Sequence, residues 1–257
     1  MGHEGMSLVE LVREGAKVRL TDEEGEPISI ELLPGLTPAE IEELEGTLPC
    51  PLPAEVRELL ELCGGVDGVG AEVDFSRLRG TNVLHDLFPH GLAIASDGFG
   101  NFWTVDLWPS SQEWGPIYFH CHDPPMILLQ SPSLRHFLGA LFEPCQPGNA
   151  IDDVHEDRLF EVWRKNPGAL SHAECLASSD EALRAFAREL PPAFEIIDLR
   201  NAEIGFGFSW KHMHKTAVRR AGELPIFAYA HVRDLKESEK LPGERSTHRV
   251  QVGRPFK

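Results

Sequence analysis

Long hydrophobic runs are missing from this sequence of 257 residues. No apolar stretch approaches the ~18–20 residues that a helix needs to span a bilayer, which argues against a transmembrane protein and against a membrane as its partner. The opening residues, MGHEGM, contain no basic stretch followed by an apolar core, so no secretion signal is visible. With 42% apolar and 25% charged residues, the composition is that of an ordinary soluble chain. We therefore expect a cytoplasmic protein with one large domain or two small ones.

Cysteine is also scarce, and its spacing excludes the common cysteine frameworks. The five cysteines form no CxxC pair and are odd in number, so we expect no disulfide framework. In a reducing compartment such residues usually behave as small buried apolar side chains. The positions concerned are Cys50, Cys63, Cys121, Cys145 and Cys175.

Positive charge is scarce along most of the chain. The whole sequence carries 24 Lys and Arg against 41 Asp and Glu, a formal net charge of −17. Residues 211–257 hold 11 basic and 5 acidic side chains, so residues 1–210 hold 13 basic and 36 acidic ones, a net charge of −23. Such a body repels nucleic acid, because affinity for phosphates rests on Lys and Arg. It attracts cationic partners instead, so we expect a protein partner and no nucleic acid.

The N-terminal third predicts a hairpin followed by two helices. In residues 17–33, apolar residues alternate on either side of an acidic, glycine-containing turn, which is typical of a β-hairpin. Thr37 as N-cap, Pro38 at the first helical position and Glu40 three residues after the cap predict a helix start. A second helix is predicted over residues 54–63, with Gly64 placed to end it.

These two helices are strongly acidic. Residues 37–62 contain seven glutamates, and Arg57 is their only basic residue. The apolar residues of each helix repeat at helical spacing and so predict one buried stripe each. We therefore expect a pair of helices with an acidic outer face.

Short strands separated by Gly and Pro follow, and one loop between them is a candidate binding site. Strands are predicted over residues 90–96, 101–107, 115–121 and 125–130. The loop Asp97–Asn101 joins the first two and contains a carboxylate, an amide and two glycines.

This loop fits neither a calcium nor a dinucleotide motif. An EF-hand needs an oxygen ligand at its third position and a glutamate at its twelfth, where Phe99 and Trp108 stand. A dinucleotide loop needs a third glycine and a following helix, and both are missing. We interpret the loop as a tight turn, with Asp97 bonding its own backbone and both glycines permitting a positive φ.

Helical patterns return after the strands. A helix starting at Ser131-Pro132 is predicted to run to residue 143, followed by a linker over Glu143–Asn149. Helices are then predicted over residues 151–166 and 178–190, and strands over residues 194–200, 203–210 and 225–232. We therefore predict two parts, a domain over residues 1–148 and a smaller α/β extension over residues 149–257.

A histidine–cysteine cluster offers a second candidate site. His120 and His122 flank Cys121 on a predicted strand, so both imidazoles share one face, as a metal site could use. His212 and His214 form a similar pair. No spacing supplies a third and fourth ligand, so half-exposed strand histidines are the favoured interpretation and a metal site is the alternative.

The same cluster allows a cysteine nucleophile to be considered. Neighbours on a strand point to opposite faces, so neither flanking histidine can serve Cys121 as a base. The base would have to be His85, His90 or another distant residue, and nothing in the sequence argues for one.

Residues 205–220, GFGFSWKHMHKTAVRR, combine aromatic and basic side chains. Such interleaving can bind single-stranded nucleic acid, but the acidic body argues against it. Phe206, Phe208 and Trp210 alternate, which predicts one buried face of a strand. We interpret the segment as a core strand with a basic rim, formed by Lys211, Lys215, Arg219 and Arg220.

The order of the elements resembles a known family. The matching positions over residues 37–142 are Leu52-Pro53 before the second helix, Gly64-Gly65 after it, Asp97-Gly98 and Gly100-Asn101 in the turn, and Asp106-Leu107 on the next strand. Together they resemble the SUKH superfamily, the Smi/Knr-type cell-wall-assembly-regulator family. The resemblance implies an α+β fold, with a mixed, mostly antiparallel twisted sheet and helices packed on it. It also implies a binding function without agreed catalytic residues, and we expect no cofactor and no metal.

Three hypotheses of function follow. Bacterial members of the family are linked to immunity, so the first is an immunity protein that neutralises a polymorphic or contact-dependent toxin. Its acidic surface would occupy the phosphate-binding groove of a basic toxin domain through Glu40, Glu43, Glu55, Glu58 and Glu61. The second is an intracellular regulator or scaffold of the cell-wall-assembly type that binds an endogenous partner. The third is a metal or thiol enzyme at His120–Asp123, whereas the first two are not enzymes.

Overall fold

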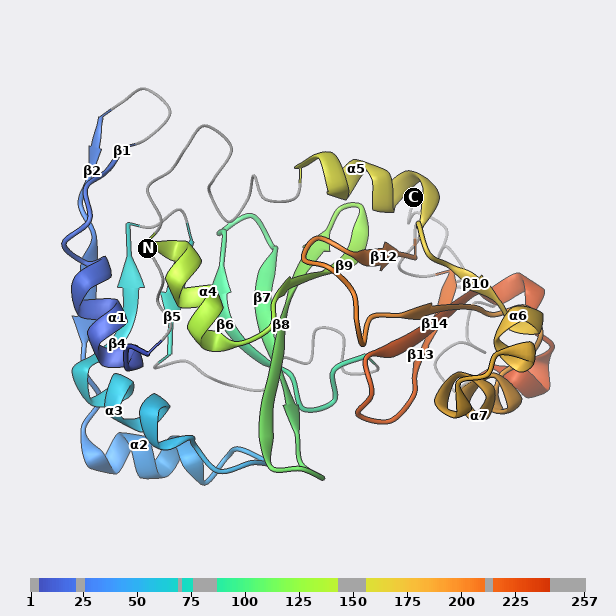
Figure 1. Cartoon of the computed structure of the whole chain (residues 1–257), viewed down its shortest axis with the longest axis horizontal. Helices are drawn as coiled ribbons and strands as arrows, with labels where there is room; N and C mark the ends of the chain where they lie inside the picture. The colour runs from blue at the N-terminus through green and yellow to red at the C-terminus, as the bar shows by residue number, and fades with distance from the viewer. Residues whose placement is uncertain are drawn as a thin grey trace, which may run out of the picture.

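An antiparallel sheet of eight strands is the centre of the molecule (Figure 1). The computed structural model describes residues 5–21, 26–68, 71–75, 87–142, 156–210 and 215–240. Along the sheet the strands follow the order β12-β9-β8-β7-β6-β5-β4-β3. Their bounds are β3 Glu31–Pro34, β4 Cys63–Asp67, β5 Glu72–Asp74, β6 Leu92–Ser96, β7 Phe102–Trp108, β8 Glu113–His122, β9 Pro125–Ser131 and β12 Gly207–Ser209. The predicted α+β class and the strands β6 to β9 are confirmed.

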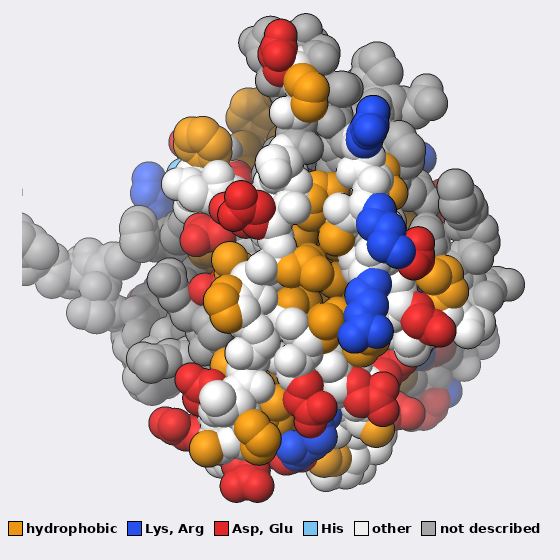
Figure 2. Space-filling model, turned by 90° about the vertical axis from the view of Figure 1, so that its left-hand side faces the viewer, with side chains coloured by type: hydrophobic (Ala, Val, Ile, Leu, Met, Phe, Trp, Pro, Cys, Tyr) orange, Lys and Arg blue, Asp and Glu red, His pale blue; other side chains and the backbone are white. Residues whose placement is uncertain are grey.

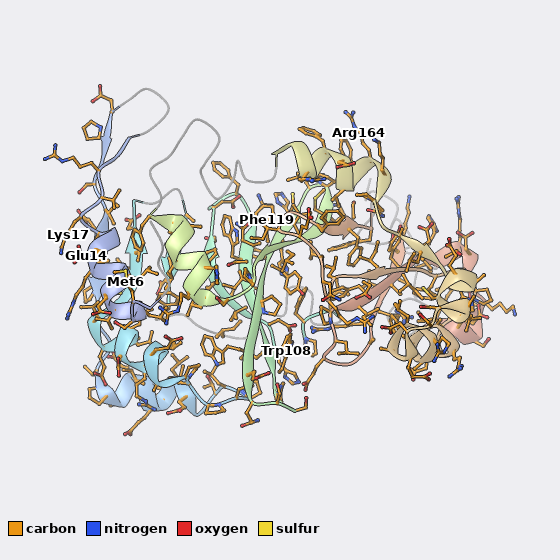
Figure 3. The ribbon with its side chains drawn as sticks, viewed as in Figure 1. Met6, Glu14, Lys17, Trp108, Phe119 and Arg164 are labelled. Carbon is orange, nitrogen blue, oxygen red and sulfur yellow. The ribbon has the colours of Figure 1, made fainter. Side chains whose placement is uncertain are left out.

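Helices pack on one face of this sheet. They are α1 (Leu8–Gly15), α2 (Pro38–Glu45), α3 (Ala54–Leu62) and α4 (Leu134–Leu141). Alternate residues of the central strands, among them Trp103 and Val105 of β7 and Phe119 of β8, join their apolar side chains in one core. Figure 3 marks Phe119 on its strand in the middle of the sheet. Burying this apolar surface is the main source of stability for such a layer.

Local capping signals explain where these helices begin. Thr37 caps α2 as predicted, since its side chain and that of Glu40 form a capping box with Pro38 in the first turn. Helix α1 was not predicted, although Ser7 and Glu10 form the same kind of capping box there. Its buried residues, Leu8, Leu11 and Val12, have the spacing of one helix face.

Two boundaries differ from the sequence prediction. Gly64 does not end α3 as a helix cap, because the chain turns at Cys63 into strand β4, which contains both glycines. A Cβ on Gly65 would lie 2.1 Å from the carbonyl oxygen of Val73, so glycine lets the two strands approach. Helix α4 is capped by Ser133 and not by Ser131, which ends β9.

The N-terminal hairpin is confirmed but short. Strands β1 (Leu20–Thr21) and β2 (Pro27–Ile28) pair antiparallel, with Leu20 opposite Ile28. The apolar residues that follow belong to β3, which leaves the hairpin and forms one edge of the main sheet.

The C-terminal part has a sheet of its own. Four antiparallel strands follow the order β10-β11-β14-β13, with bounds β10 Leu170–Ser171, β11 Glu195–Asp198, β13 Thr216–Arg220 and β14 Ile226–His231. Helices α6 (His172–Ala177) and α7 (Glu181–Glu189) pack on it through a separate apolar core. Helix α5 (Glu156–Lys165) and strands β11, β12 and β14 were predicted, whereas β10, β13 and α6 were not.

The two parts meet on the second face of the main sheet. Strand β12 pairs with β9, so the C-terminal part adds the edge strand of the eight-stranded sheet. Tyr118 and Ile127 of the main sheet share a core with Phe208 and Phe227 of the C-terminal part. The predicted boundary at residues 148 and 149 and the predicted linker Glu143–Asn149 lie outside the described residues, so this division stays a prediction.

The described part of the chain contains no helix that combines the length and the apolar character needed to cross a membrane.

Candidate functional site

The loop Asp97–Asn101 is the turn between β6 and β7. Asp97 Oδ1 accepts the backbone N–H groups of Phe99 at 2.8 Å and Asn101 at 3.1 Å, and Oδ2 accepts Asn101 Nδ2 at 2.5 Å. Gly98 and Gly100 have φ values of 74° and 100°, in the left-handed region that favours glycine. The carboxylate therefore holds the turn together, as predicted, and its oxygens are engaged by the chain itself.

Removing this carboxylate is expected to weaken the turn only locally. Asp97→Ala removes the acceptor of three hydrogen bonds, and we expect the free energy of unfolding to fall by about 1–2 kcal/mol. Urea denaturation measures the loss. If added calcium or phosphate raises the melting temperature of the parent protein but not that of Asp97→Ala, the loop is a ligand site and this account of it is wrong.

The histidine–cysteine cluster is split between two environments. His120 is buried against Phe88, with ring centroids 5.0 Å apart, whereas His122 is exposed and hydrogen-bonds Asn101 Oδ1. The prediction of half-exposed histidines is therefore wrong for His120. In the described residues no group of three or more His, Cys, Asp or Glu is arranged to hold a metal ion. His85, His212 and His214 lie outside these residues.

Burial also sets the protonation of this cluster. Burial lowers the pKa of His120 to about 3, so the imidazole is neutral throughout the physiological range. Burial raises the pKa of the Cys121 thiol, which keeps it protonated and weakens it as a nucleophile. The other described cysteines, Cys50, Cys63 and Cys175, are also free and buried, as predicted, and Cys145 lies outside the described residues.

Three polar side chains on the second face of the sheet are buried without a hydrogen bond to the described chain. They are Thr104, Tyr118 and His120. Thr104 lies directly opposite Tyr118 in the β7–β8 pairing, and His120 is two residues further along β8. Burial, with the Asp106 carboxylate nearby, raises the pKa of Tyr118, so its hydroxyl stays protonated. A buried polar group without a partner costs stability.

The buried imidazole predicts a pH dependence of stability. Unfolded His120 binds a proton below its ordinary pKa of about 6.5, whereas the folded form does not until about pH 3. Its contribution is therefore fully present above pH ~6.5 and is lost as the pH falls toward ~3, by about 1.4 kcal/mol per unit. We expect His120→Leu to remove this one-proton slope in urea denaturation series. An unchanged slope between pH ~6 and ~4 would show that His120 is not the group responsible.

The predicted acidic side chains of α2 and α3 are all exposed, but they are not equally available. Glu40 is engaged in the capping box with Thr37, and Glu55 forms an ion pair with Arg135. No hydrogen bond or ion pair joins Glu43, Glu58 or Glu61 to the described part of the chain. Within the described part of the chain, nothing occupies these three exposed carboxylates.

Acidic and basic side chains occupy different areas of the face that carries these helices. Figure 2 shows Asp and Glu side chains gathered at its lower end, where α2 and α3 lie in Figure 1. Lys and Arg side chains follow one side of a central apolar strip in the same view. The N-terminal segment contributes exposed Arg13, Lys17 and Arg19, of which Lys17 pairs with Glu14 at 2.6 Å on the outer side of α1 (Figure 3). The free acidic surface is therefore the α2–α3 end and not the whole face.

The positions on which the family resemblance rests lie where elements of the main domain begin, end or change register. Pro53 is the N-cap of α3, Gly64-Gly65 opens β4, and Asp106-Leu107 lies at an irregularity in the β7–β8 register. Residues 35–140 match the SMI1 / KNR4 family (SUKH-1). We call these residues the SUKH-1 segment. It runs from the approach to α2 almost to the end of α4, and confirms the resemblance over that part of the chain. No curated protein matches the chain.

Asp106 of the SUKH-1 segment forms a buried ion pair with the C-terminal part. Arg220 on β13 donates from its two terminal nitrogens to the two carboxylate oxygens, at 2.9 and 2.5 Å. Only 4% of the arginine side chain and 1% of the aspartate side chain are exposed. The Trp108 indole N–H donates to the same carboxylate at 2.7 Å. Because water is excluded from this bidentate pair, its electrostatic attraction is stronger than that of an ion pair on the surface.

Further contacts fix Arg220 in place. Its guanidinium donates to the backbone oxygens of Leu87 and Glu223 and lies 5.4 Å from the ring centroids of Phe88 and Phe227. The predicted basic rim is therefore wrong for Arg220, which is part of the core. Lys211 lies outside the described residues. The predicted buried face is confirmed for Phe208 and Trp210, while Phe206 is half-buried. No pattern in the sequence indicated that Arg220 would meet Asp106.

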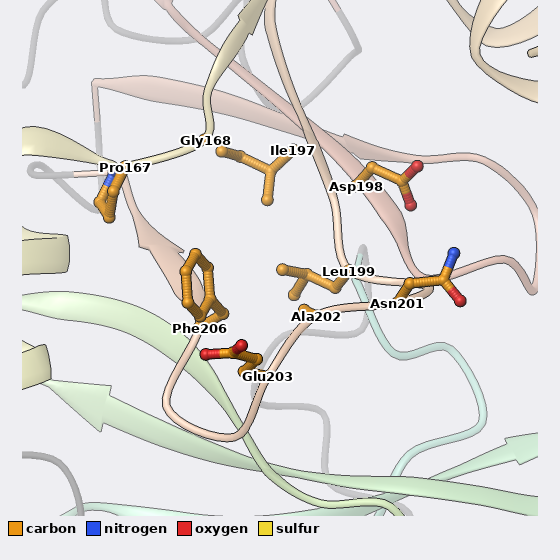
Figure 4. A pocket seen from close by; sticks show the side chains of 9 residues that line it. All are labelled: Pro167, Gly168, Ile197, Asp198, Leu199, Asn201, Ala202, Glu203 and Phe206. Atoms are coloured by element: carbon orange, nitrogen blue, oxygen red, sulfur yellow. The ribbon is translucent and has the colours of Figure 1, made fainter.

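Two of the hollows in the described molecule lie on opposite parts of it. One, of about 380 Å³, belongs to the C-terminal part, where Ile197, Leu199 and Phe206 turn toward one another (Figure 4). The Asp198 carboxylate on its wall is bound by Arg200 at 2.6 Å. The other, of about 570 Å³, lies beside α2 and includes Glu43. Only the second hollow contains a residue of the predicted partner-binding set.

Proposed function

We propose that this protein is a non-catalytic immunity protein that neutralises a basic toxin domain through the acidic end of its SUKH-1 segment. At the family level, the match of residues 35–140 supports a role of the immunity or Smi1/Knr4 kind. The observation that carries the finer proposal is the set of exposed, unengaged carboxylates of Glu43, Glu58 and Glu61 on two adjoining helices.

These carboxylates stand on a rigid support. Ile41 of α2 and Val56, Leu59 and Leu60 of α3 are buried in the core under the sheet. The backbone of such fixed helices gains little further order on binding, because it is already in place. Opposite charge on a partner raises the association rate most strongly when such charges act together.

In this proposal the two predicted parts have different tasks. Residues 1–148 carry the recognition surface, and the extension over residues 149–257 supports the sheet from its second face through Arg220 and β12. Recognition requires no bond-making step, no cofactor and no metal.

A second candidate is an intracellular regulator or scaffold that binds an endogenous partner, which the same family match supports. The chemistry of the surface is identical in the two cases, and only the source of the partner differs.

Recovery of the partner separates the two candidates. The protein is used as bait in lysate of its source cell, and toxin-like domains encoded near its gene are co-expressed with it in a test host. We expect one basic domain that kills the host alone and is tolerated when the protein is present. Recovery of an endogenous enzyme, with no protection from any toxin domain, would favour the regulator and overturn the immunity proposal.

A further inference from the structure

The larger hollow is an apolar groove at the end of α2. One wall is formed by Glu43 of α2 and by residues 47–49, which follow the end of that helix. The other wall is the segment Pro89–Gly91. Leu92 of β6 and Leu107 of β7 form the floor, and each is only 2% exposed. We call this hollow, of about 570 Å³, the α2 groove.

The floor of the α2 groove is rigid and apolar. Leu92 and Leu107 belong to the main core of the sheet, and Leu48 packs against that core from the helix side. Side chains so placed give a preformed surface, and apolar area covered by a ligand there adds binding energy at about 25 cal/mol per Å². A partner side chain of aromatic or aliphatic type would gain the most from it.

The rim of the groove adds the carboxylate of Glu43, and the exposed imidazole of His90 belongs to the lining of the same groove. Glu43 is exposed, and no Lys, Arg or His of α2 lies beside it, since the helix contains Pro, Ala, Ile, Leu and four glutamates. The nearest ion pair of the two helices joins Arg57 to Glu45 and leaves Glu43 free. A partner that inserts an apolar side chain therefore meets a carboxylate at the groove edge.

We infer that the α2 groove is the anchor pocket for the basic partner, and that it takes an aromatic side chain flanked by lysine or arginine. This inference rests on the proposed function and deepens it. Most of the energy of an interface comes from a few buried anchors, with charged pairs at the rim. The acidic helices speed the encounter, and the groove holds the partner afterwards.

Short peptides with blocked ends test the inference directly. The probes are Lys-Trp-Lys, Gln-Trp-Gln and Lys-Ser-Lys, added to the full chain at a few millimolar, the range for a ligand worth about 4 kcal/mol. Amide NMR signals report which residues respond. We expect Lys-Trp-Lys to move the signals of Leu48, His90 and Leu92, Gln-Trp-Gln to move them more weakly, and Lys-Ser-Lys to leave them in place.

Three variants complete the test. Thr47→Phe fills the groove from an exposed position and should weaken Lys-Trp-Lys at least about tenfold. Glu43→Gln should weaken it about 1.5- to 5-fold, the range of one exposed ion pair. Glu42→Gln, on the same helix but outside the groove, is the matched control and should leave the affinity unchanged.

Defined outcomes overturn the inference. They are equal responses to Lys-Ser-Lys and Lys-Trp-Lys, no response at the groove, or equal effects of Glu43→Gln and Glu42→Gln. Binding of the basic partner that survives Thr47→Phe but is lost on charge reversal of the helices would remove the anchor and leave the proposed function standing. If the peptide binds in the groove but binding of the partner does not depend on the helix charges, the groove remains a binding site and the proposed function is overturned.

Discussion

Replacing Arg220 by methionine is expected to lower the free energy of unfolding by about 3–5 kcal/mol. The change leaves the Asp106 carboxylate, of which 1% is exposed, without the cation that compensates its charge. It also withdraws the donors to the backbone oxygens of Leu87 and Glu223. A buried charge that loses its partner is among the costliest defects a folded chain can carry.

Urea denaturation of four variants checks this expectation. Arg188→Met is the control, because Arg188 pairs with Glu181 at 3.4 Å on the surface and should cost less than about 1 kcal/mol. The double variant Asp106→Asn/Arg220→Met should recover much of the loss, since the charge is gone while the Trp108 indole keeps an acceptor. Asp106→Asn alone closes the cycle. If Arg220→Met costs no more than Arg188→Met, the buried pair does not hold the two parts together.

Reversing the three free carboxylates is expected to slow association with the basic partner about ten- to a hundredfold at low salt. The variant Glu43→Lys/Glu58→Lys/Glu61→Lys replaces attraction by repulsion at the surface where the partner docks. All three side chains are exposed, so the fold should be unaffected. Stopped-flow measurement of the association rate constant, with the partner recovered from the source cell, gives the result.

A second triple variant separates the site from net charge. Glu189, Glu195 and Glu203 are exposed and belong to the C-terminal part and not to α2 or α3, and their change to lysine alters the net charge by the same amount. We expect this control to keep the association rate constant within about threefold of the parent value. Equal slowing by both triples would show that overall charge acts and that the α2–α3 surface is not the docking site.

Local signals made much of the SUKH-1 segment predictable. The Thr37-Pro38-Glu40 start of α2 and the short apolar runs of β6 to β9, separated by Gly and Pro, depend on neighbours in sequence, and both appear as expected. The turn at Asp97 is likewise local, since its hydrogen bonds span four residues at most. Helix α1 carried the same capping signal at Ser7 and Glu10, so the sequence did contain the means to predict it.

Other features depend on contacts that no local pattern encodes. Asp106 and Arg220 are separated by 114 positions, and either one alone has the character of an ordinary surface charge. Gly64-Gly65 fits a helix end or a close strand pairing equally well, and the approach of β5 decides between them. The burial of His120 under Phe88 and the shape of the α2 groove also arise only when distant segments pack together.

The proposed function requires recognition by fixed negative charge, which makes the association rate constant depend on salt. The association rate constant is measured for the parent protein and for the Glu43/Glu58/Glu61 reversal from about 0.01 M to about 1 M salt, over which the screening length falls from ~30 to ~3 Å. We predict a steep fall for the parent and a flat or rising rate for the reversed variant, with the two values converging at high salt. Parallel curves for both proteins would show that the charges of α2 and α3 do not recognise the partner.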